Sequence, residues 1–363
     1  MRILIVTGSF PPLKCGVGDY SMQLALALSN QPGTTVAVLT SRAVGLSAAP
    51  GGLAVLAEMA GWRLSEARKA FRLIRQFSPD VVHVQYPTQG YAKGKLPSFI
   101  PALSKLAGAK VVQTWHEPIH WRETLQLLLR LVVPSEVVVV RDAFRTMLNP
   151  IAGLILKRKR LHYVCGASTL PRSDLSAAER VSLRHGYLKG QQRLLVFFGF
   201  VYPPKGVDLL FEIGDWKTDH IVIAGEFGTT PEYRERLIAL SGGEWAGKVT
   251  FTGFLAPQDA ASLLTVADAV ILPFRQGGGN WNSSIHGAIA NGAYVITTSS
   301  GEASYDPVNN VASTRIDDVV AMRAALSLSD RRRSLGSNAE SVTWESVSAR
   351  HLQIYRDSGA KGI

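Results

Sequence analysis

Short apolar runs alternate along the chain with stretches in which apolar residues recur at the three- and four-residue spacing of a helix. Many of the runs end at or beside a Gly or Pro, which is typical of buried strands in a parallel sheet. We therefore expect strands over 3–8, 35–41, 81–86, 110–117, 136–140 and 162–165, and again over 193–199, 220–225, 248–253, 269–274 and 294–299. Helical spacing predicts helices over 18–29, 64–77 and 344–357.

The alternation of strand and helix predicts an α/β fold of two Rossmann-like domains, each an open parallel sheet with helices on both faces. A polar stretch near 171–193 marks the break between them. We expect an N-terminal domain over 1–170, a second domain over 171–343, and a C-terminal helical segment, 344–363, that can cross back to the first. Ligands of such sheets bind at the carboxyl ends of the strands, so the two sheets are expected to face a central cleft.

Composition narrows the class of protein. With 46% hydrophobic and 18% charged residues, a chain of 363 residues can bury two cores, and disorder is not expected. Cys15 and Cys165 are too few for a disulfide framework or a zinc site. No signal peptide or bilayer-spanning apolar run is evident, so the cytoplasm is the expected location.

The net charge of +11 predicts an anionic partner, such as nucleotide phosphates or anionic lipid. Two basic runs, 157–160 and 331–333, can be interpreted as solvated helix ends, and we favour this interpretation for the run 331–333. No nucleic-acid-binding motif accompanies them, so nucleic acid is not an expected partner.

The loop after the first predicted strand contains Gly16 and Gly18 directly before a helix. Glycines there let the backbone approach a ligand closely, and the helix points its positive end at the same place. Both are candidate donor-binding residues, although glycines in such turns are also common for structural reasons. Their spacing is not that of a dinucleotide fingerprint, which disfavours an oxidoreductase.

Four stretches, in this order, resemble motifs of the large retaining GT-B glycosyltransferase family (glycosyl transferases group 1) that includes bacterial mannosyl- and glucosyltransferases. They are the Pro-Pro and glycine-pair loop at 8–28, the strand ending in His-Glu at 110–117, the Lys-Gly segment at 197–212 and the core at 249–298. The resemblance implies a GT-B fold, a UDP- or GDP-sugar as donor, no further cofactor, and a glycan or lipid-linked acceptor.

The sequence departs from the family pattern in the second half. The usual arginine before the lysine is absent from the stretch Phe200–Tyr202, and the two usual glutamates fall on Gly279 and Gly287. The usual contacts to the donor sugar and ribose are therefore missing or rebuilt.

The resemblance assigns the donor to the second domain. Lys205 would pair with the diphosphate, on which charge grows as it leaves, although on composition alone it is a surface lysine. Glu226, at another strand end, is either a nucleotide contact or a solvated loop residue. The turn before the helix near 283 would hold the phosphates or serve only as a cap, and its candidate donor-binding residues are Gly279, Asn280, Asn282, Ser283 and Ser284.

His116 ends a strand, a position that favours function over packing. In the resembled family the matching histidine faces the reacting sugar, so His116 and Lys205 are the candidate catalytic residues. Tyr20, Tyr86 and Glu117 are candidate acceptor contacts. His83 is expected to pack in the core.

The segment 121–134 combines a tryptophan, five leucines and two arginines. It is either an interfacial helix lying on a membrane or a buried helix of the first domain. Lipid-linked acceptors are common in the resembled family, which keeps the membrane alternative open.

The sequence therefore predicts a hexosyltransferase-like enzyme of polysaccharide or glycoconjugate biosynthesis, cytoplasmic or at the inner face of the membrane. It is expected to be metal-independent, because no Asp-x-Asp stands at a strand end. Two alternatives remain open. The missing glutamates motivate a catalytically weak or inactive GT-B protein that binds a glycan or partner. A GT-B sugar-nucleotide epimerase would need acidic and basic residues that the second-half motif lacks.

Overall fold

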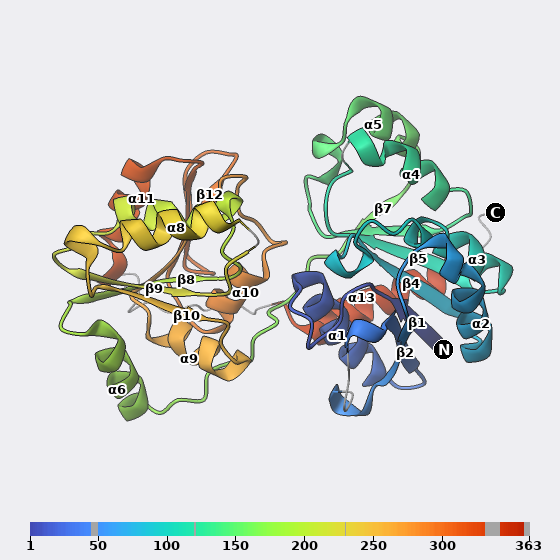
Figure 1. Ribbon diagram of the computed structural model, residues 1–363, viewed down its shortest axis with the longest axis horizontal. Coiled ribbons are helices and arrows are strands. Elements are labelled where there is room, and N and C mark those ends of the chain that lie inside the picture. Colours follow the sequence, from blue (N-terminus) through green and yellow to red (C-terminus); the bar gives the residue numbers. More distant parts are fainter. Residues whose placement is uncertain (45–49, 120, 229, 331–341, 359–363) are drawn as a thin grey trace. The chain divides into compact units, whose positions relative to one another are not determined.

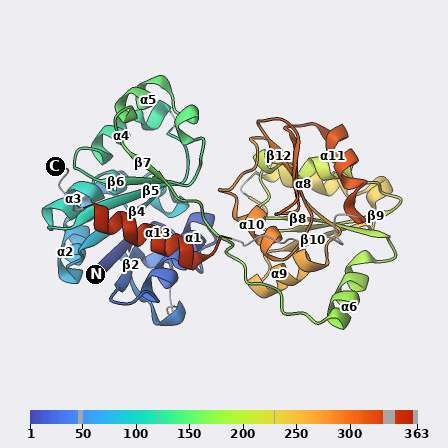
Figure 2. The same ribbon diagram turned by 180° about the vertical axis from the view of Figure 1, so that it is seen from behind.

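The computed structural model describes residues 1–44, 50–119, 121–228, 230–330 and 342–358. The chain forms two compact units: Met1–Ala167 together with the C-terminal segment from Val342, and Ser168–Ser341. Figures 1 and 2 show each unit from opposite sides as a sheet covered by helices on both faces. The basic run 331–333 lies outside the described residues.

The first unit contains seven parallel strands in the order β3-β2-β1-β4-β5-β6-β7. They are β1 (Arg2–Val6), β2 (Thr35–Ser41), β3 (Ala54–Met59), β4 (Val81–Tyr86), β5 (Lys110–Trp115), β6 (Glu136–Val139) and β7 (Leu161–Tyr163). The helices are α1 (Gly16–Ser29), α2 (Ala67–Phe77), α3 (Ile100–Leu106), α4 (Thr124–Arg130), α5 (Pro150–Leu156) and α13 (Trp344–Asp357). The strand order reverses between β1 and β4, so the loops that follow them diverge and leave room for a ligand.

The two faces of the first sheet bury different kinds of side chain. One face packs Leu4 and Val82 against α2 and α3 in an apolar cluster. The other is covered by α1 and α13, which pack against one another. Because side chains alternate along a strand, His83 and Gln85 of β4 lie on this second face.

The second unit also has a seven-stranded sheet, in the order β10-β9-β8-β11-β12-β14-β13, in which only β13 is antiparallel. The strands are β8 (Arg193–Phe198), β9 (Asp219–Ala224), β10 (Val249–Gly253), β11 (Ala269–Leu272), β12 (Val295–Ser299), β13 (Ser304–Asp306) and β14 (Val311–Arg315). The helices are α6 (Ala177–Leu188), α7 (Leu210–Ile213), α8 (Pro231–Leu240), α9 (Pro257–Val266), α10 (Ser283–Ala290) and α11 (Val319–Leu326).

The predicted α/β class is confirmed, and each expected strand forms within a few residues of its expected bounds. Three strands were not expected. β3 is a half-exposed strand at the edge of the sheet, whose short apolar run over 54–57 we did not select. β13 and β14 are short and rich in Ser, Asp and Thr, so neither forms an apolar run. The polar stretch near 171–193 is no simple linker, because it contains α6, which begins at a capping box between Ser176 and Glu179.

Glycines allow very close backbone contacts at the carboxyl edge of the second sheet. A Cβ atom on Gly225 would lie 1.8 Å from the carbonyl oxygen of Gly199, and one on Gly206 would lie 2.1 Å from that of Pro273. Gly206 also adopts φ +66°, a left-handed conformation that side chains disfavour. The loops after β8, β9 and β11 can therefore meet only where these side chains are absent.

We predict that Gly206→Ala destabilises the second unit by about 2–4 kcal/mol, because it adds left-handed strain to a clash with the backbone. Gly253 is a matched control, since it has the same φ but no atom within 4 Å of its Cβ position. Gly253→Ala should cost only about 1 kcal/mol. Urea unfolding of both variants measures the difference, and equal losses would show that the backbone at Pro273 can move away freely.

Candidate active site

The loops after β8 and β9 are joined beyond the ends of the two strands. Val201 and Phe227 form an isolated parallel bridge, in which Val201 N donates to Glu226 O at 2.9 Å and Gly228 N donates to Val201 O at 3.0 Å. Glu226 is thereby held in the loop that directly follows β9, with a partly buried side chain. Glu226 thus stands at a strand end, where the sequence places it, and its contact with a nucleotide stays a prediction.

Lys205 lies on a 3₁₀ turn, Pro203–Lys205, and not at the start of an α-helix as expected. Two prolines and the left-handed Gly206 interrupt the helix, and a second 3₁₀ turn separates them from α7. The Lys205 Nζ atom lies 4.4 Å from the centre of the Phe274 ring. Arg275 N donates to Pro204 O at 2.9 Å, so this turn is attached to the loop after β11.

The neighbouring cation, Arg275, is engaged by carboxylates. Its guanidinium donates to Asp208 at 2.9 Å and to Asp317 at 2.7 Å. Asp208 is buried and also accepts a hydrogen bond from the Tyr233 hydroxyl at 2.9 Å. Asp208 and Asp317 thus hold the Arg275 guanidinium in the loop after β11.

The glycine-rich loop after β11 is held by backbone hydrogen bonds. Gly278 N donates to Thr298 O at 2.7 Å, and Asn282 N donates to Gly279 O at 2.9 Å. His286 donates from Nε2 to Asn280 O at 2.8 Å, and burial lowers its pKa, which keeps the ring neutral. The loop is thus shaped by its own backbone and by His286, which we did not select from the sequence.

Asn282 occupies the N-cap position of α10, but its side chain does not cap the helix. Its Oδ1 accepts from Gly279 N at 3.0 Å instead, and no side chain caps α10. The expectation of a side-chain cap is therefore wrong, because the loop competes for the same oxygen. Backbone amides at Ser283 and Ser284 open the helix, and the positive end of a helix is a favourable place for an anion.

The structure thus brings most of the predicted donor residues to one edge of one sheet. The Ser284 side chain lies 3.9 Å from the position that a Cβ on Gly199 would occupy, which connects the start of α10 to the end of β8. The gathered candidates are Lys205, Glu226, Gly279, Asn280, Asn282, Ser283 and Ser284. A cation, a helix N-terminus and open glycine backbone together suit a phosphate group.

In the first unit, His116 directly follows β5 and is 9% exposed. Its backbone N donates to Tyr86 O at 2.8 Å, and its Nε2 lies 2.9 Å from the side-chain oxygen of Gln85. The ring meets Tyr20 edge to face, with centroids 4.8 Å apart. The strand end therefore holds this imidazole in one orientation.

A buried chain of hydrogen bonds continues from His116 to the last helix. Gln85 Nε2 lies 3.2 Å from His83 Nε2, which also lies 2.7 Å from the Thr114 hydroxyl, and His83 Nδ1 lies 2.6 Å from the Tyr355 hydroxyl. His83 is fully buried, as expected, but it packs through polar contacts. The available sequence signal was a pair of polar residues at alternate positions of an apolar strand.

Burial keeps these imidazoles uncharged. It lowers the pKa of His116 to about 3 and that of His351, which lies beside His83 on α13, to about 4. It also lowers the pKa of His83 well below its usual value. Since the Gln85 oxygen can only accept, His116 carries its proton on Nε2, and its Nδ1 is a hydrogen-bond acceptor.

The other residues predicted near His116 divide between packing and exposure. Tyr20 is buried between His116 and Trp344, so it supports His116 and does not present a face to an acceptor. Gly18 packs against the backbone of Ser9, whereas Gly16 is exposed and has no atom near its Cβ position. Asp19, which we did not select, lies in the first turn of α1, and burial raises its pKa to about 6.

Tyr86 and Glu117, the remaining predicted acceptor contacts, are engaged by arginines of the same unit. The Arg130 guanidinium lies 3.2 Å from the centre of the Tyr86 ring. Arg141 donates to the Glu117 carboxylate at 2.5 Å, although half of the Glu117 side chain stays exposed. Both side chains are thus held in place at the carboxyl edge of the first sheet.

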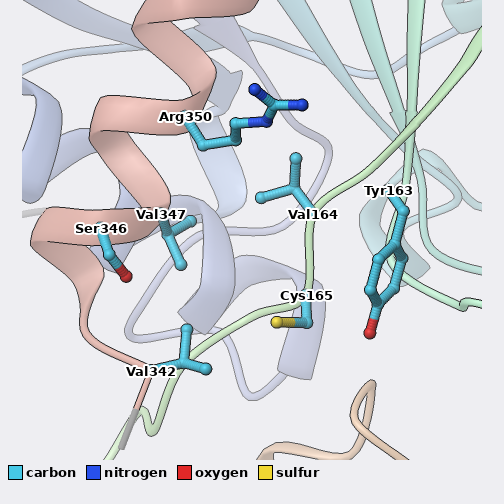
Figure 3. Close-up of a pocket in the computed structure, with 7 residues that line it drawn as sticks. All are labelled: Tyr163, Val164, Cys165, Val342, Ser346, Val347 and Arg350. Carbon is cyan, nitrogen blue, oxygen red and sulfur yellow. The ribbon is translucent and has the colours of Figure 1, made fainter. Parts of the chain in front are cut away.

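A shallow hollow lies where β7 ends and α13 begins (Figure 3). Its lining is mostly apolar and comprises Tyr163, Val164, Cys165, Val342, Ser346, Val347 and Arg350. It contains none of the residues gathered near His116, so we do not count it as part of the candidate active site. Among the described residues, no group of three or more His, Cys, Asp or Glu is placed to hold a metal ion.

Comparison with known proteins gives a family match for the second unit and shows the fold of the whole chain. Residues 192–327 match the family model of glycosyl transferases group 1. The structure resembles Anabaena HepE in complex with UDP (14% identity, 98% of this chain and 100% of the other, TM-score 0.75). It also resembles a Rickettsia africae glycosyltransferase (14% identity, 99% of this chain and 99% of the other, TM-score 0.72). A third similar structure is sucrose-phosphate synthase from Thermosynechococcus elongatus (16% identity, 98% of this chain and 98% of the other, TM-score 0.72). No curated protein matches the sequence.

These likenesses show that the chain has the GT-B fold. More particularly, its second unit carries a glycosyl transferases group 1 domain, so the resemblance noted in the sequence is confirmed. The matched range begins one residue before β8 and ends after α11. It includes all of the candidate donor residues gathered at the edge of the second sheet. None of the described helices has the length and apolar character needed to cross a bilayer.

The buried histidines predict acid sensitivity of the first unit. Unfolded histidines bind a proton near pH 6.5, whereas folded His116 and His351 do so only near 3 and 4. Between these values the unfolded state binds more protons. The free energy of unfolding should therefore fall as pH decreases below 6.5, by up to about 1.4 kcal/mol per pH unit for each histidine.

His351→Asn should reduce the number of protons taken up on unfolding by close to one, and so reduce the dependence of the unfolding free energy on pH. Urea unfolding between about pH 6 and pH 5 measures this change. His185 is an exposed histidine on α6, and His185→Asn should leave the slope unchanged. A slope that stays the same in His351→Asn would show that the folded protein already carries a proton at this ring.

Proposed function

We propose that the protein transfers a hexose from a UDP- or GDP-sugar to a glycan or lipid-linked acceptor, with retention of configuration. The proposal places the reaction in the cytoplasm, in polysaccharide or glycoconjugate biosynthesis. The observation that carries it is the grouping of Lys205, the glycine loop and the start of α10 inside a glycosyl transferases group 1 domain. HepE, which has the same fold, was solved in complex with UDP, and this favours a uridine donor.

In this proposal the second unit binds the donor through its diphosphate. Lys205 and the amides that open α10 supply positive potential where charge develops on the leaving group. They supply it without a resident metal. Glu226 is the candidate contact to the nucleoside, because a carboxylate accepts hydrogen bonds from ribose hydroxyls and would repel phosphate.

Gly279 stands where the resembled family has a glutamate, so a side-chain contact to the sugar is absent there. Asn280 and Asn282 flank this place, and the hydrogen bond from Gly279 N to Asn282 fixes the local backbone. We propose that the Asn280 side chain and the loop backbone provide the contact that the glutamate would make.

His116 acts in this proposal as a neutral hydrogen-bond partner of the reacting sugar. Because its pKa lies near 3, the ring is a neutral imidazole at neutral pH and not an imidazolium acid. Its Nε2 is committed to Gln85, so Nδ1 is the atom available to accept from a hydroxyl. Gly16, Gly18 and the Asp19 carboxyl lie on the loop and helix start beside Tyr20, and we propose that they border the same site.

Lys205 provides the test of donor binding. UDP should raise the melting temperature of the protein, because a ligand of the native state stabilises it. Lys205→Ala should weaken UDP binding on the order of tenfold, less than a fully buried charged hydrogen bond would, because the lysine is partly exposed. Calorimetry of UDP binding measures the change.

Lys217 offers a matched control, since it is a second-unit lysine whose Nζ lies 5.3 Å from the centre of the Trp216 ring. Lys217→Ala should bind UDP like the parent protein. Equal affinity in the parent and in both variants would remove Lys205 from the site, and the absence of any shift across UDP, GDP and ADP would contradict the donor assignment itself.

His116→Ala should lower turnover about 100-fold and change UDP affinity less than about twofold, because a group on the reacting sugar matters most in the transition state. Release of UDP from UDP-glucose measures turnover, and calorimetry measures affinity. Gln85→Leu should give an intermediate loss of turnover, since it removes only the group that orients the ring. Near-normal turnover in His116→Ala would make His116 a structural residue.

A further inference from the structure

Exposed apolar side chains gather in one short segment of the first unit. Of the eighteen large hydrophobic residues that are exposed in the described part of the chain, eight lie between residues 121 and 154. They are Trp121, Leu125, Leu128, Leu129, Val132, Met147, Ile151 and Leu154. A cluster of this kind on a folded protein usually marks an interaction surface.

The cluster follows helical spacing on α4. Leu125, Leu128 and Leu129 recur at intervals of three and one residues, which places them on one side of the helix, and Val132 follows two residues after its end. Leu125 is 78% exposed, whereas Leu127 on the opposite side is fully buried. The helix therefore turns a complete apolar stripe toward solvent, the reverse of the usual arrangement.

The helix α5 adjoins α4 and adds to the surface. At their N-terminal ends, the Asn149 side chain donates to the Thr124 hydroxyl at 3.1 Å. Beyond their C-terminal ends, Lys159 donates to Ser135 O. Figures 1 and 2 both place the two helices next to each other. We call the eight exposed residues on these helices and their flanks the apolar surface.

Basic residues border the apolar surface at one end. Arg145 donates to Leu156 O at 3.0 Å and to Lys159 O at 2.6 Å, which places it beside the basic run at the end of α5. Lys157, Arg158 and Arg160 of this run are exposed. Between residues 121 and 160 the chain has eight Lys and Arg against three Asp and Glu.

We propose that the apolar surface and its basic border dock the first unit onto an anionic lipid bilayer. Leucine and tryptophan side chains insert into the interface of a bilayer, and lysines and arginines attract anionic headgroups. The same combination fits an ordinary protein partner less well, because the stripe is continuous, aliphatic and convex on a helix. The proposal concerns binding alone and does not depend on the proposed function.

Sedimentation with vesicles tests the proposal without any sugar transfer. The protein should bind vesicles of equal parts phosphatidylcholine and phosphatidylglycerol, bind phosphatidylcholine alone much more weakly, and lose binding as salt increases. Leu125→Ser with Leu154→Ser should reduce binding about tenfold or more, because two exposed leucines no longer enter the interface. Lys157→Gln, Arg158→Gln and Arg160→Gln together should reduce it by a similar factor.

Matched controls come from elsewhere in the chain. Val181 and Val320 are 70% and 77% exposed on the second unit, so Val181→Ser with Val320→Ser removes similar apolar exposure. Arg68→Gln, Arg72→Gln and Arg75→Gln on α2 remove the same charge as the basic-border variant. Both controls should bind like the parent protein. The proposal is wrong if the parent ignores anionic vesicles, if the controls lose as much binding, or if the leucine variant instead abolishes self-association.

Discussion

The candidate donor residues at the carboxyl edge of the second sheet are brought together by close backbone contacts that only glycine allows. The loop after β8 contacts the loop after β9 at Gly199 and Gly225, and it contacts the loop after β11 at Gly206 and Pro273. These contacts seat the Lys205 turn against Phe274 and place the end of β8 beside Ser284. The parallel sheet brings strand ends to one edge. Because Gly199, Gly206 and Gly225 have no side chains, the loops after these strands can also approach one another closely.

In the first unit the corresponding constraint is the burial of uncharged imidazoles. His83 lies beside His351 of α13, and the hydrogen bonds of His83 connect Tyr355 with Gln85 and so with His116. A positive charge on one of these buried imidazoles would have no carboxylate among the described groups that contact it. Charging the ring therefore costs free energy, and this cost lowers the pKa values of the histidines. The last helix is thus part of the first unit's core, and its His351 and Tyr355 contact His83, which lies more than 200 positions earlier in the sequence.

Apolar runs were sufficient to predict the α/β class and most strands, because buried parallel strands need continuous apolar sequence. They did not reveal β3, at one edge of the first sheet, or β13 and β14, which are short and polar strands at one end of the second sheet. Sequence order also selected Lys205, Glu226 and the residues 279–284, since parallel strands end at a shared edge. It could not show that Asn282 would turn to Gly279, that Tyr20 would be buried, or that Arg275 would pair with Asp208 and Asp317. The first outcome depends on the local shape of the glycine loop, and the other two depend on contacts between segments far apart in the chain.

The orientation of α4 illustrates the same limit. Leucines occupy both sides of this helix, so their spacing predicts a helix but not which side is buried. Arg130 decides between the sides. It is 2% exposed, its guanidinium lies 3.2 Å from the centre of the Tyr86 ring, and its carbonyl accepts from Gln113 at 2.9 Å. Leu128 and Leu125, two and five positions before Arg130, lie on the far side of α4 from it. When Arg130 is buried against the Tyr86 ring, the opposite side of α4, with Leu125 and Leu128, faces solvent unless another surface covers it.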